Sequence, residues 1–294
     1  MSISVNPLSV IDNKFDNGRK LGREEESPVL PAAYDTYEGV TVDMERAPLM
    51  EPDVFSSRLE ASISQWRKQL KKGVWIKLPI KKMNLVESAV KQGFVFHHAE
   101  PTYLMLVYWI PKVPCTLPPN ASHQVGVGAV VVNDRRKILV VQENSGCLRG
   151  MGLWKIPTGI VCEGEDINAA VVREVKEETG IETEFVEILA FRQAHKVFFG
   201  KSDLFFICML RPVSFEIQTE EVELEDAKWM PFEEYAAQQA EREDGLFKSI
   251  TEVCVEKLCG KYDGFLPVPM KAVFCGRSNY FYRSGKNLNM VDYS

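Results

Sequence analysis

Three glutamates and an arginine lie close together in the sequence, at Arg173, Glu174, Glu177 and Glu178. On an α-helix, residues three and four positions apart share one face, so the three carboxylates would gather within about one turn. Like charges at this spacing repel each other and destabilise an isolated helix. Carboxylate oxygens are ligands that Mg²⁺ prefers, together with waters and substrate phosphates. The spacing therefore favours a divalent-cation site, although such a cluster alone is also typical of a solvated helix face.

The sequence around this cluster predicts the helix that must carry it. Asp166 is suited to the N-cap, and Gly180 is suited to the left-handed residue that ends a helix. The apolar side of this helix is formed by Val171, Val172 and Val175. Arg173 stands four residues before Glu177, so an ion pair can orient that carboxylate. Gly159 permits a tight loop ahead of the helix. We therefore expect a loop followed by a helix over residues 166–179.

The wider spacing resembles the Nudix box. Gly159, five residues, Glu165, seven residues and then the run from Arg173 to Ile181 match that motif at every fixed position. The resemblance implies an α/β fold, an α/β/α sandwich in which the box forms a loop–helix–loop. It also implies a hydrolase that cuts the diphosphate of a nucleoside-diphosphate-linked substrate.

The resemblance also implies which residues bind the metal. The family's metal ligands correspond to Glu174 and Glu178, and Glu177 is a further ligand or the group that activates water. The carbonyl of Gly159 often joins them. The implied metal is Mg²⁺, with Mn²⁺ as an alternative.

Three further residues receive roles from the same resemblance. Arg173 supports the glutamates, and Glu165 helps to hold the loop. Many members recruit another carboxylate from a later loop, and Glu223 in the acid-rich stretch 216–226 aligns best with it. A solvated loop acid is the alternative for Glu223. The predicted catalytic set is Glu177, Glu178, Arg173 and Glu223.

The rest of the chain predicts a second, smaller domain. Residues 1–33 are polar and predict a disordered tail. Residues 34–115 predict strand–helix–strand–helix–strand, a small α+β domain. Four prolines between positions 111 and 119 predict a linker. The Nudix domain is expected at residues 123–260, and residues 261–294 form an extension whose periodicity is too weak to place elements.

A closer likeness covers most of residues 34–260. The stretches KKGVWIKLP, GFVFHHAEPTYLMLVYWIP, FRQAHK and AKWMPFEEY resemble plant ADP-ribose/NADH pyrophosphatases of the Nudix superfamily. The resemblance makes residues 34–115 a pre-Nudix domain similar to half of an acetyltransferase fold. It lacks a glycine-rich acetyl-CoA loop, so acetyl transfer is not expected. Homodimerisation through this domain is an expectation.

Substrate contacts are expected from three residues. Arg192 and His195 could contact phosphate or ribose, and Trp154 could stack on adenine, although a surface ion pair or a core position is the alternative for each. Within the Nudix class, diphosphoinositol polyphosphates, capped RNA and oxidised nucleotides stay open as substrates. A non-catalytic nucleotide sensor is the competing class, but the complete set of box glutamates argues for activity.

Composition limits the partners. The 294 residues carry 35 Lys and Arg against 41 Asp and Glu, a net charge of −6, which does not favour duplex nucleic acid. The seven cysteines are an odd number without a CxxC pair, which is typical of reduced thiols. No apolar run approaches the roughly 20 residues of a membrane helix. We expect a cytoplasmic protein, and a nuclear location stays open.

Overall fold

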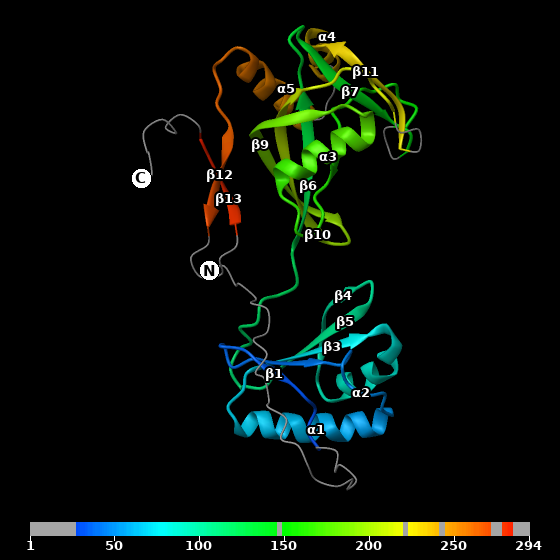
Figure 1. Cartoon of the computed structure of the whole chain (residues 1–294), viewed down its shortest axis with the longest axis vertical. Helices are drawn as coiled ribbons and strands as arrows, with labels where there is room; N and C mark the ends of the chain where they lie inside the picture. The colour runs from blue at the N-terminus through cyan, green and yellow to red at the C-terminus, as the bar shows by residue number, and fades with distance from the viewer. Residues whose placement is uncertain (1–27, 146–148, 220–222, 241–244, 272–277, 285–294) are drawn as a thin grey trace, which may run out of the picture. The chain divides into compact units, whose positions relative to one another are not determined.

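The computed structural model describes residues 28–145, 149–219, 223–240, 245–271 and 278–284 (Figure 1). The chain divides between Ala121 and Ser122 into two compact units. In the described residues, no helix has both the length and the apolar character needed to cross a membrane.

The N-terminal unit is a five-stranded sheet with helices α1 and α2. The strand order is β1-β2-β3-β5-β4, and β2 and β3 are parallel while the other neighbours are antiparallel. The elements are β1 (Ala33–Tyr34), β2 (Val40–Asp43), α1 (Pro52–Lys68), β3 (Gly73–Pro79), the short 3₁₀ helix η1 (Ile80–Leu85), α2 (Val86–Lys91), β4 (Val95–Glu100) and β5 (Tyr103–Trp109).

The core of this unit lies between α1 and the sheet. Alternate residues of β3 are fully buried, as expected for a strand with one covered face, and they are Val74, Ile76 and Leu78. The side chains of α1 that join them follow helical spacing: Phe55, Leu59, Ile63 and Trp66. Pro52 begins α1, where a missing N–H costs nothing.

Two expectations for this unit require correction. The tail predicted for residues 1–33 is too long, because Leu30 is buried in the core and its N–H donates to Ser62 Oγ at 2.8 Å. Residues 1–27 lie outside the described residues. The predicted strand–helix pattern also misses β4, whose six residues include two histidines and so give no alternating apolar signal.

The second unit carries the box and has two sheets and three helices. The larger sheet has the order β13-β12-β9-β10-β6-β8, and the smaller pairs β11 with β7. The elements are β6 (His123–Val131), β7 (Lys137–Glu143), β8 (Thr158–Ile160), α3 (Ile167–Thr179), β9 (Thr183–Phe198), β10 (Lys201–Pro212), β11 (Leu224–Pro231), α4 (Phe232–Ala240), α5 (Gly245–Leu258), β12 (Phe265–Lys271) and β13 (Ser278–Ser284).

The alternation of β6 builds the layers of this unit. Val127, Ala129 and Val131 lie in one core with α3, whereas Val130 lies in a second core with α4 and α5. Because successive residues of a strand point to opposite faces, a strand that is apolar on both faces must be covered on both. The layers are therefore α/β/α, as the sequence predicts.

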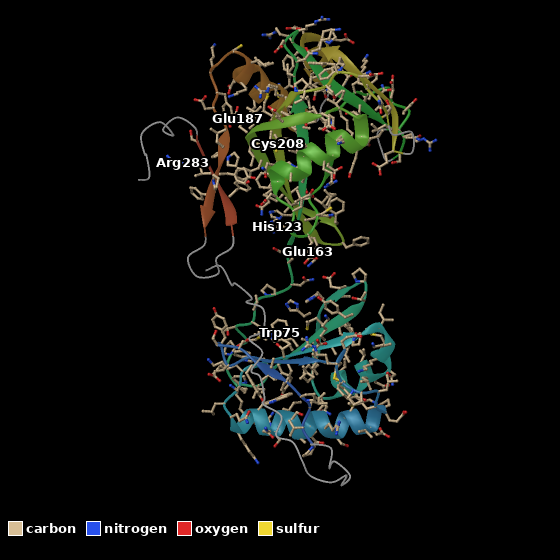
Figure 2. All side chains as sticks on the ribbon, viewed as in Figure 1. Trp75, His123, Glu163, Glu187, Cys208 and Arg283 are labelled. Atoms are coloured by element: carbon tan, nitrogen blue, oxygen red, sulfur yellow. The ribbon has the colours of Figure 1, made fainter. Side chains whose placement is uncertain are left out.

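The C-terminal extension joins this unit. β12 and β13 form an antiparallel hairpin, and Phe265 of β12 pairs with Ile188 of β9. Gly264 is required at this junction because a Cβ there would lie 2.2 Å from the Ile188 carbonyl oxygen. Its N–H donates at 2.7 Å to Glu187, whose side chain is labelled in Figure 2. The described part of residues 261–294 thus extends the sheet, although Pro267 and Pro269 obscure its strand pattern in the sequence.

Candidate metal and active site

The helix α3 has the ends that the sequence predicts. Asp166 is the N-cap residue, and its carbonyl accepts the N–H of Ala170 at 2.9 Å, but its side chain makes no capping bond. Gly180 ends the helix with φ 69°, in the left-handed region that favours glycine. The buried side of α3 includes Ala170, Val171 and Val175, together with Glu178. The helix therefore packs its apolar stripe on the sheet and carries one carboxylate inward with it.

Gly159 lies where α3 crosses β8. A Cβ at this position would stand 1.8 Å from the Cδ atom of Glu174, so any other residue would displace that carboxylate from its place beside the strand. The next residue, Ile160, donates its N–H to Glu174 Oε1 at 3.1 Å. The strand and the helix are therefore locked together at the first predicted metal ligand.

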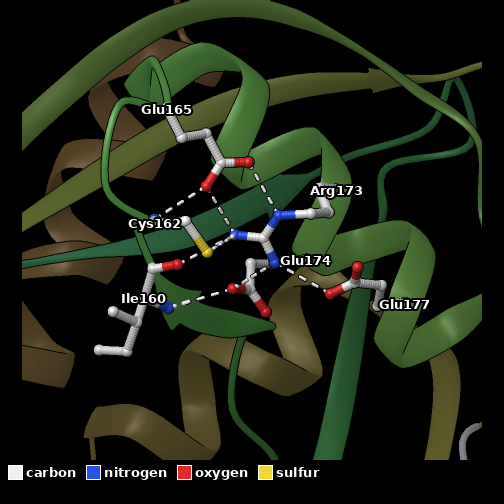
Figure 3. A network of polar contacts seen from close by, with 6 residues as sticks. All are labelled: Ile160, Cys162, Glu165, Arg173, Glu174 and Glu177. Atoms are coloured by element: carbon white, nitrogen blue, oxygen red, sulfur yellow. Dashed lines mark hydrogen bonds and ion pairs between the residues drawn. The ribbon is translucent and has the colours of Figure 1, made fainter. Parts of the chain in front are cut away.

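Arg173 links three carboxylates and the loop (Figure 3). Its Nε and Nη2 atoms donate to the two oxygens of Glu165, each at 2.8 Å, which is the bidentate geometry that guanidinium groups favour. Its Nη1 atom donates to Glu174 at 2.8 Å and to Glu177 at 2.9 Å. Nη2 also donates to the Ile160 carbonyl at 3.0 Å. One side chain therefore fixes the positions of three acids.

The same contacts set the charge of these acids. The hydrogen bonds that Arg173 donates to Glu165 lower the pKa of that carboxyl to about 2, and the same bonds are the main cause of the raised pKa of the guanidinium. Burial raises the pKa of Glu174, and the nearby Arg173 opposes that rise. Glu165 is therefore a permanent anion that holds the arginine in place.

Glu178 is the most buried of the box glutamates, with 6% of its surface exposed. Its Oε2 atom is buried and has no hydrogen-bond partner. Burial, with smaller contributions from Glu174 and Glu223, raises the pKa of Glu178 to about 8, while Lys155 and the Thr158 N–H act in the opposite direction. A buried carboxylate oxygen without a partner is costly, so this atom calls for a proton or a cation.

The predicted metal ligands differ in exposure. Glu177 has 60% of its side chain exposed and contacts Arg173, while Glu174 and Glu178 are mostly buried. Within the described part of the chain, no group of three or more His, Cys, Asp or Glu side chains is arranged to hold a metal on its own. Mg²⁺ does not need such a cage, because it keeps waters and substrate phosphates as ligands. The partnerless oxygen of Glu178 beside other carboxylates fits a hard divalent cation.

Glu223 lies near this cluster, although it is exposed. It precedes β11 directly, its carbonyl accepts the Asn144 N–H at 3.0 Å, and its charge contributes to the raised pKa of Glu178. The structure thus brings Glu223 into the electrostatic range of the box.

Two residues of the site have no signal in the sequence motif. Lys155 is buried, with 6% exposed, and its Nζ atom lies 2.5 Å from Glu143 Oε1. It also donates to Thr158 Oγ1 at 2.8 Å. Lys155 stands four residues before the box, and Glu143 is at the end of β7, so only the tertiary fold brings them to Glu178.

The three predicted substrate-binding residues each have a partner of their own. Arg192 forms an ion pair with Asp203 at 2.6 Å, the surface alternative considered for it. His195 is exposed and its Nδ1 atom lies 2.9 Å from Ser202 Oγ. Trp154 packs against the second core, with the Lys228 ammonium 4.3 Å from its ring centroid. None of the three has a contact with a box glutamate among those found in the described residues.

Comparison with known proteins assigns the family. Residues 30–110 match the Nudix hydrolase domain model, and residues 122–250 match the NUDIX domain model. Nudix hydrolase 2 of Arabidopsis thaliana is 55% identical over 271 residues, which cover 92% of each chain. Nudix hydrolase 10 of the same plant is 54% identical over 254 residues, covering 86% of this chain and 89% of the relative. The human protein named nucleoside diphosphate-linked moiety X motif 6 is 39% identical over 213 residues, covering 70% and 66%. The chain belongs to the Nudix hydrolase family and resembles its plant members.

Proposed function

We propose that this protein is a Mg²⁺-dependent diphosphatase that cuts ADP-ribose, NADH or both. The products are AMP with ribose 5-phosphate, or AMP with reduced nicotinamide mononucleotide. The observation that carries the proposal is the buried, partnerless oxygen of Glu178 within an intact box. The likeness of the whole chain to plant ADP-ribose/NADH pyrophosphatases supports the choice of substrate, and Mn²⁺ is an alternative metal.

In the proposed mechanism, each box residue has a distinct task. Glu174 and Glu178, with the Gly159 carbonyl, hold the metal, which when bound neutralises phosphate charge and lowers the pKa of water. Arg173 keeps the glutamates in place through the contacts of Figure 3. Glu177 is exposed and accepts the proton of the attacking water. The water oxygen forms a new bond to phosphorus, and the bridging P–O bond breaks.

Other residues bind the substrate in this proposal. Arg192 and His195 lie on β9 and serve the phosphate or ribose, and Trp154 serves the base. Glu223 supplies a further carboxylate beside Glu178, consistent with its effect on the pKa of that residue. The cytoplasm is the proposed compartment, because the odd number of cysteines without a CxxC pair is typical of reduced thiols.

We also infer a homodimer through residues 34–115. The face of the N-terminal sheet away from α1 carries apolar side chains, among them Trp75, Met105 and Val107. The adjacent edge strand β4 leaves 61% of Val95 exposed. Exposed apolar surface on a sheet edge is typical of an interface. Light scattering should give a dimer mass that Val95→Glu reduces to a monomer, while Val90→Glu on α2 leaves it unchanged.

A substrate panel tests the enzyme proposal. ADP-ribose, NADH, NAD⁺, diadenosine polyphosphates, coenzyme A and diphosphoinositol phosphates are each incubated with Mg²⁺ or with EDTA, and the products are separated by chromatography. The matched variants are Glu178→Gln and Glu163→Gln, because Glu163 is an exposed glutamate of the same loop–helix segment (Figure 2).

We expect AMP from ADP-ribose or NADH, lost with EDTA and in Glu178→Gln but kept in Glu163→Gln. If the protein hydrolyses only another compound of the panel, the proposed substrate is wrong. If it binds nucleotide but hydrolyses nothing, the proposed enzymatic activity is wrong and a nucleotide sensor is favoured.

A further inference from the structure

A buried lysine stands beside the acidic cluster and is outside the box. Lys155 forms an ion pair with Glu143 and donates to the Thr158 hydroxyl. Its backbone is fixed as well, because its N–H and carbonyl both bond to Val141 of β7, at 3.0 and 2.8 Å. The backbone of Lys155 is therefore held by β7, and its ammonium group is held by Glu143 and Thr158.

The elements around Lys155 bring several acids toward it. Glu143 lies opposite Leu224 in the β7–β11 ladder, and the neighbouring Asn144 bonds to the carbonyl of Glu223. The charge of Lys155 also acts on Glu178. The ammonium of Lys155 is therefore paired with Glu143 and acts on Glu178, and Glu223 directly precedes the strand that pairs with β7.

Thr158 connects this lysine to the box. Its hydroxyl accepts from Lys155 at 2.8 Å, and its backbone N–H donates to Glu178. The Lys155–Thr158 contact therefore joins the ammonium to the strand that carries Gly159, the first residue of the box.

An ammonium in this place has two electrostatic effects. It neutralises Glu143, which is otherwise a further carboxylate open to a divalent cation. It would also repel a cation held by Glu178, because its charge acts on that carboxyl and like charges in a poorly solvated site interact strongly. Both effects limit how tightly the acidic cluster binds metal, and both keep the metal at the box glutamates.

We propose that Lys155 is a positioning residue that neutralises Glu143 and so confines the divalent cation to the box glutamates. The proposal rests on the metal-dependent function above and deepens it. It makes an unusual prediction: loss of the lysine tightens metal binding while it slows hydrolysis. A lysine that only stabilises the fold would weaken both.

Metal binding can be measured without any substrate. Mn²⁺ is titrated into EDTA-treated full-length protein, and free Mn²⁺ is followed by its electron paramagnetic resonance signal. The variants are Lys155→Met, Glu143→Gln and the double variant, with Lys261→Met as a control at an exposed lysine.

We expect Lys155→Met to bind Mn²⁺ about tenfold more tightly and Glu143→Gln about tenfold more weakly. The double variant restores the local charge and should lie within about threefold of wild type. Equal or weaker binding by folded Lys155→Met would overturn the proposal. If Lys155→Met does not fold, Glu143→Gln decides, because unchanged or tighter binding there also contradicts it.

Hydrolysis of the substrate found in the panel gives the second readout. Lys155→Met should lower kcat about tenfold, since a displaced metal misaligns the reacting groups, and should change KM less. If wild type hydrolyses none of the compounds, the proposed function is refuted, but the predicted ranking of Mn²⁺ affinities among the variants can still hold. If that ranking is reversed while hydrolysis is normal, only the role of Lys155 is refuted.

Discussion

Two buried charged side chains, one in each unit of the molecule, differ in how far their polar atoms are satisfied. In the N-terminal unit, Lys82 is 2% exposed and its ammonium donates to the carbonyls of Met44 and Ala47. In the Nudix unit, Glu178 is 6% exposed and one of its oxygens has no partner. Burial favours the neutral form of both groups, so it lowers the pKa of Lys82 and raises the pKa of Glu178.

The difference separates a structural role from a functional one. The bonds of Lys82 join the turn after β2 to η1, so the cost of burying the ammonium is offset within the fold. The offset for Glu178 is only partial, because Lys155 and the Thr158 N–H favour its charged form but its Oε2 atom has no partner, and the fold keeps it beside other acids. A buried charge that the protein does not satisfy indicates a position for a ligand. The predictions below test this contrast.

The largest effect should come from Glu178→Gln. We expect kcat to fall about 10³-fold, because a metal ligand in the site is lost while shape is kept. Without metal, the variant should melt at or above the temperature of wild type, because a costly buried carboxylate is gone. Steady-state kinetics and calorimetry in EDTA check both points. A large fall in melting temperature would mean that Glu178 is structural, like Lys82.

Arg173→Lys should have the next largest effect. One ammonium cannot reproduce the bidentate contact with Glu165 and at the same time hold Glu174 and Glu177. We expect kcat to fall about 10²-fold with KM changed by less than about threefold, since small misplacement of reacting groups is enough. A loss confined to KM would instead make Arg173 a substrate ligand. Kinetics with saturating Mg²⁺ separates the two.

Lys82→Met should act on stability alone. The variant leaves the carbonyls of Met44 and Ala47 without their donor, which should cost about 2 kcal/mol in free energy of unfolding. We expect kcat of the folded enzyme to stay within about twofold of wild type. Urea unfolding combined with kinetics is the measurement. A loss of kcat without a loss of stability would remove the contrast between the two buried charges.

The smallest effect concerns pH. The pKa of Glu178 is about 8 in the folded, metal-free protein and near 4.5 when unfolded, so folding favours the protonated form. Stability relative to Glu178→Gln should therefore fall as pH rises from about 4.5 to about 8, by about 1 kcal/mol between pH 7 and 8 alone. Unfolding in EDTA across this range measures the difference. A constant difference would show that the carboxyl is already ionised.

The sequence predicts the site best where the residues that form it are close together in the chain. The box, the helix with its Gly180 end and the requirement for Gly159 depend on residues that are close together in the chain, and the structure places them as expected. The partner of Arg192 could not be predicted, because Asp203 lies opposite Ala194 in the β9–β10 register and reaches Arg192 diagonally. The role of Lys155 could not be predicted either, because its partner Glu143 at the end of β7 is brought to it only by the tertiary fold.

The fold shows the same limit. Strongly periodic elements such as α3 are predicted to within one residue, whereas β4 and the β12–β13 hairpin are missed. Histidines in one and prolines in the other hide the alternation that identifies a strand. Such segments become strands because a neighbouring strand offers its hydrogen-bonding edge, and that information is tertiary.

The central claim is that the partnerless oxygen of Glu178 is there for a divalent cation. The most direct measurement is an anomalous difference map from crystals of the protein grown with Mn²⁺. The account predicts a peak bonded to Glu178 and shared with Glu174 or the Gly159 carbonyl. An occupied Mn²⁺ site elsewhere, with Glu178 still without a partner, would contradict it.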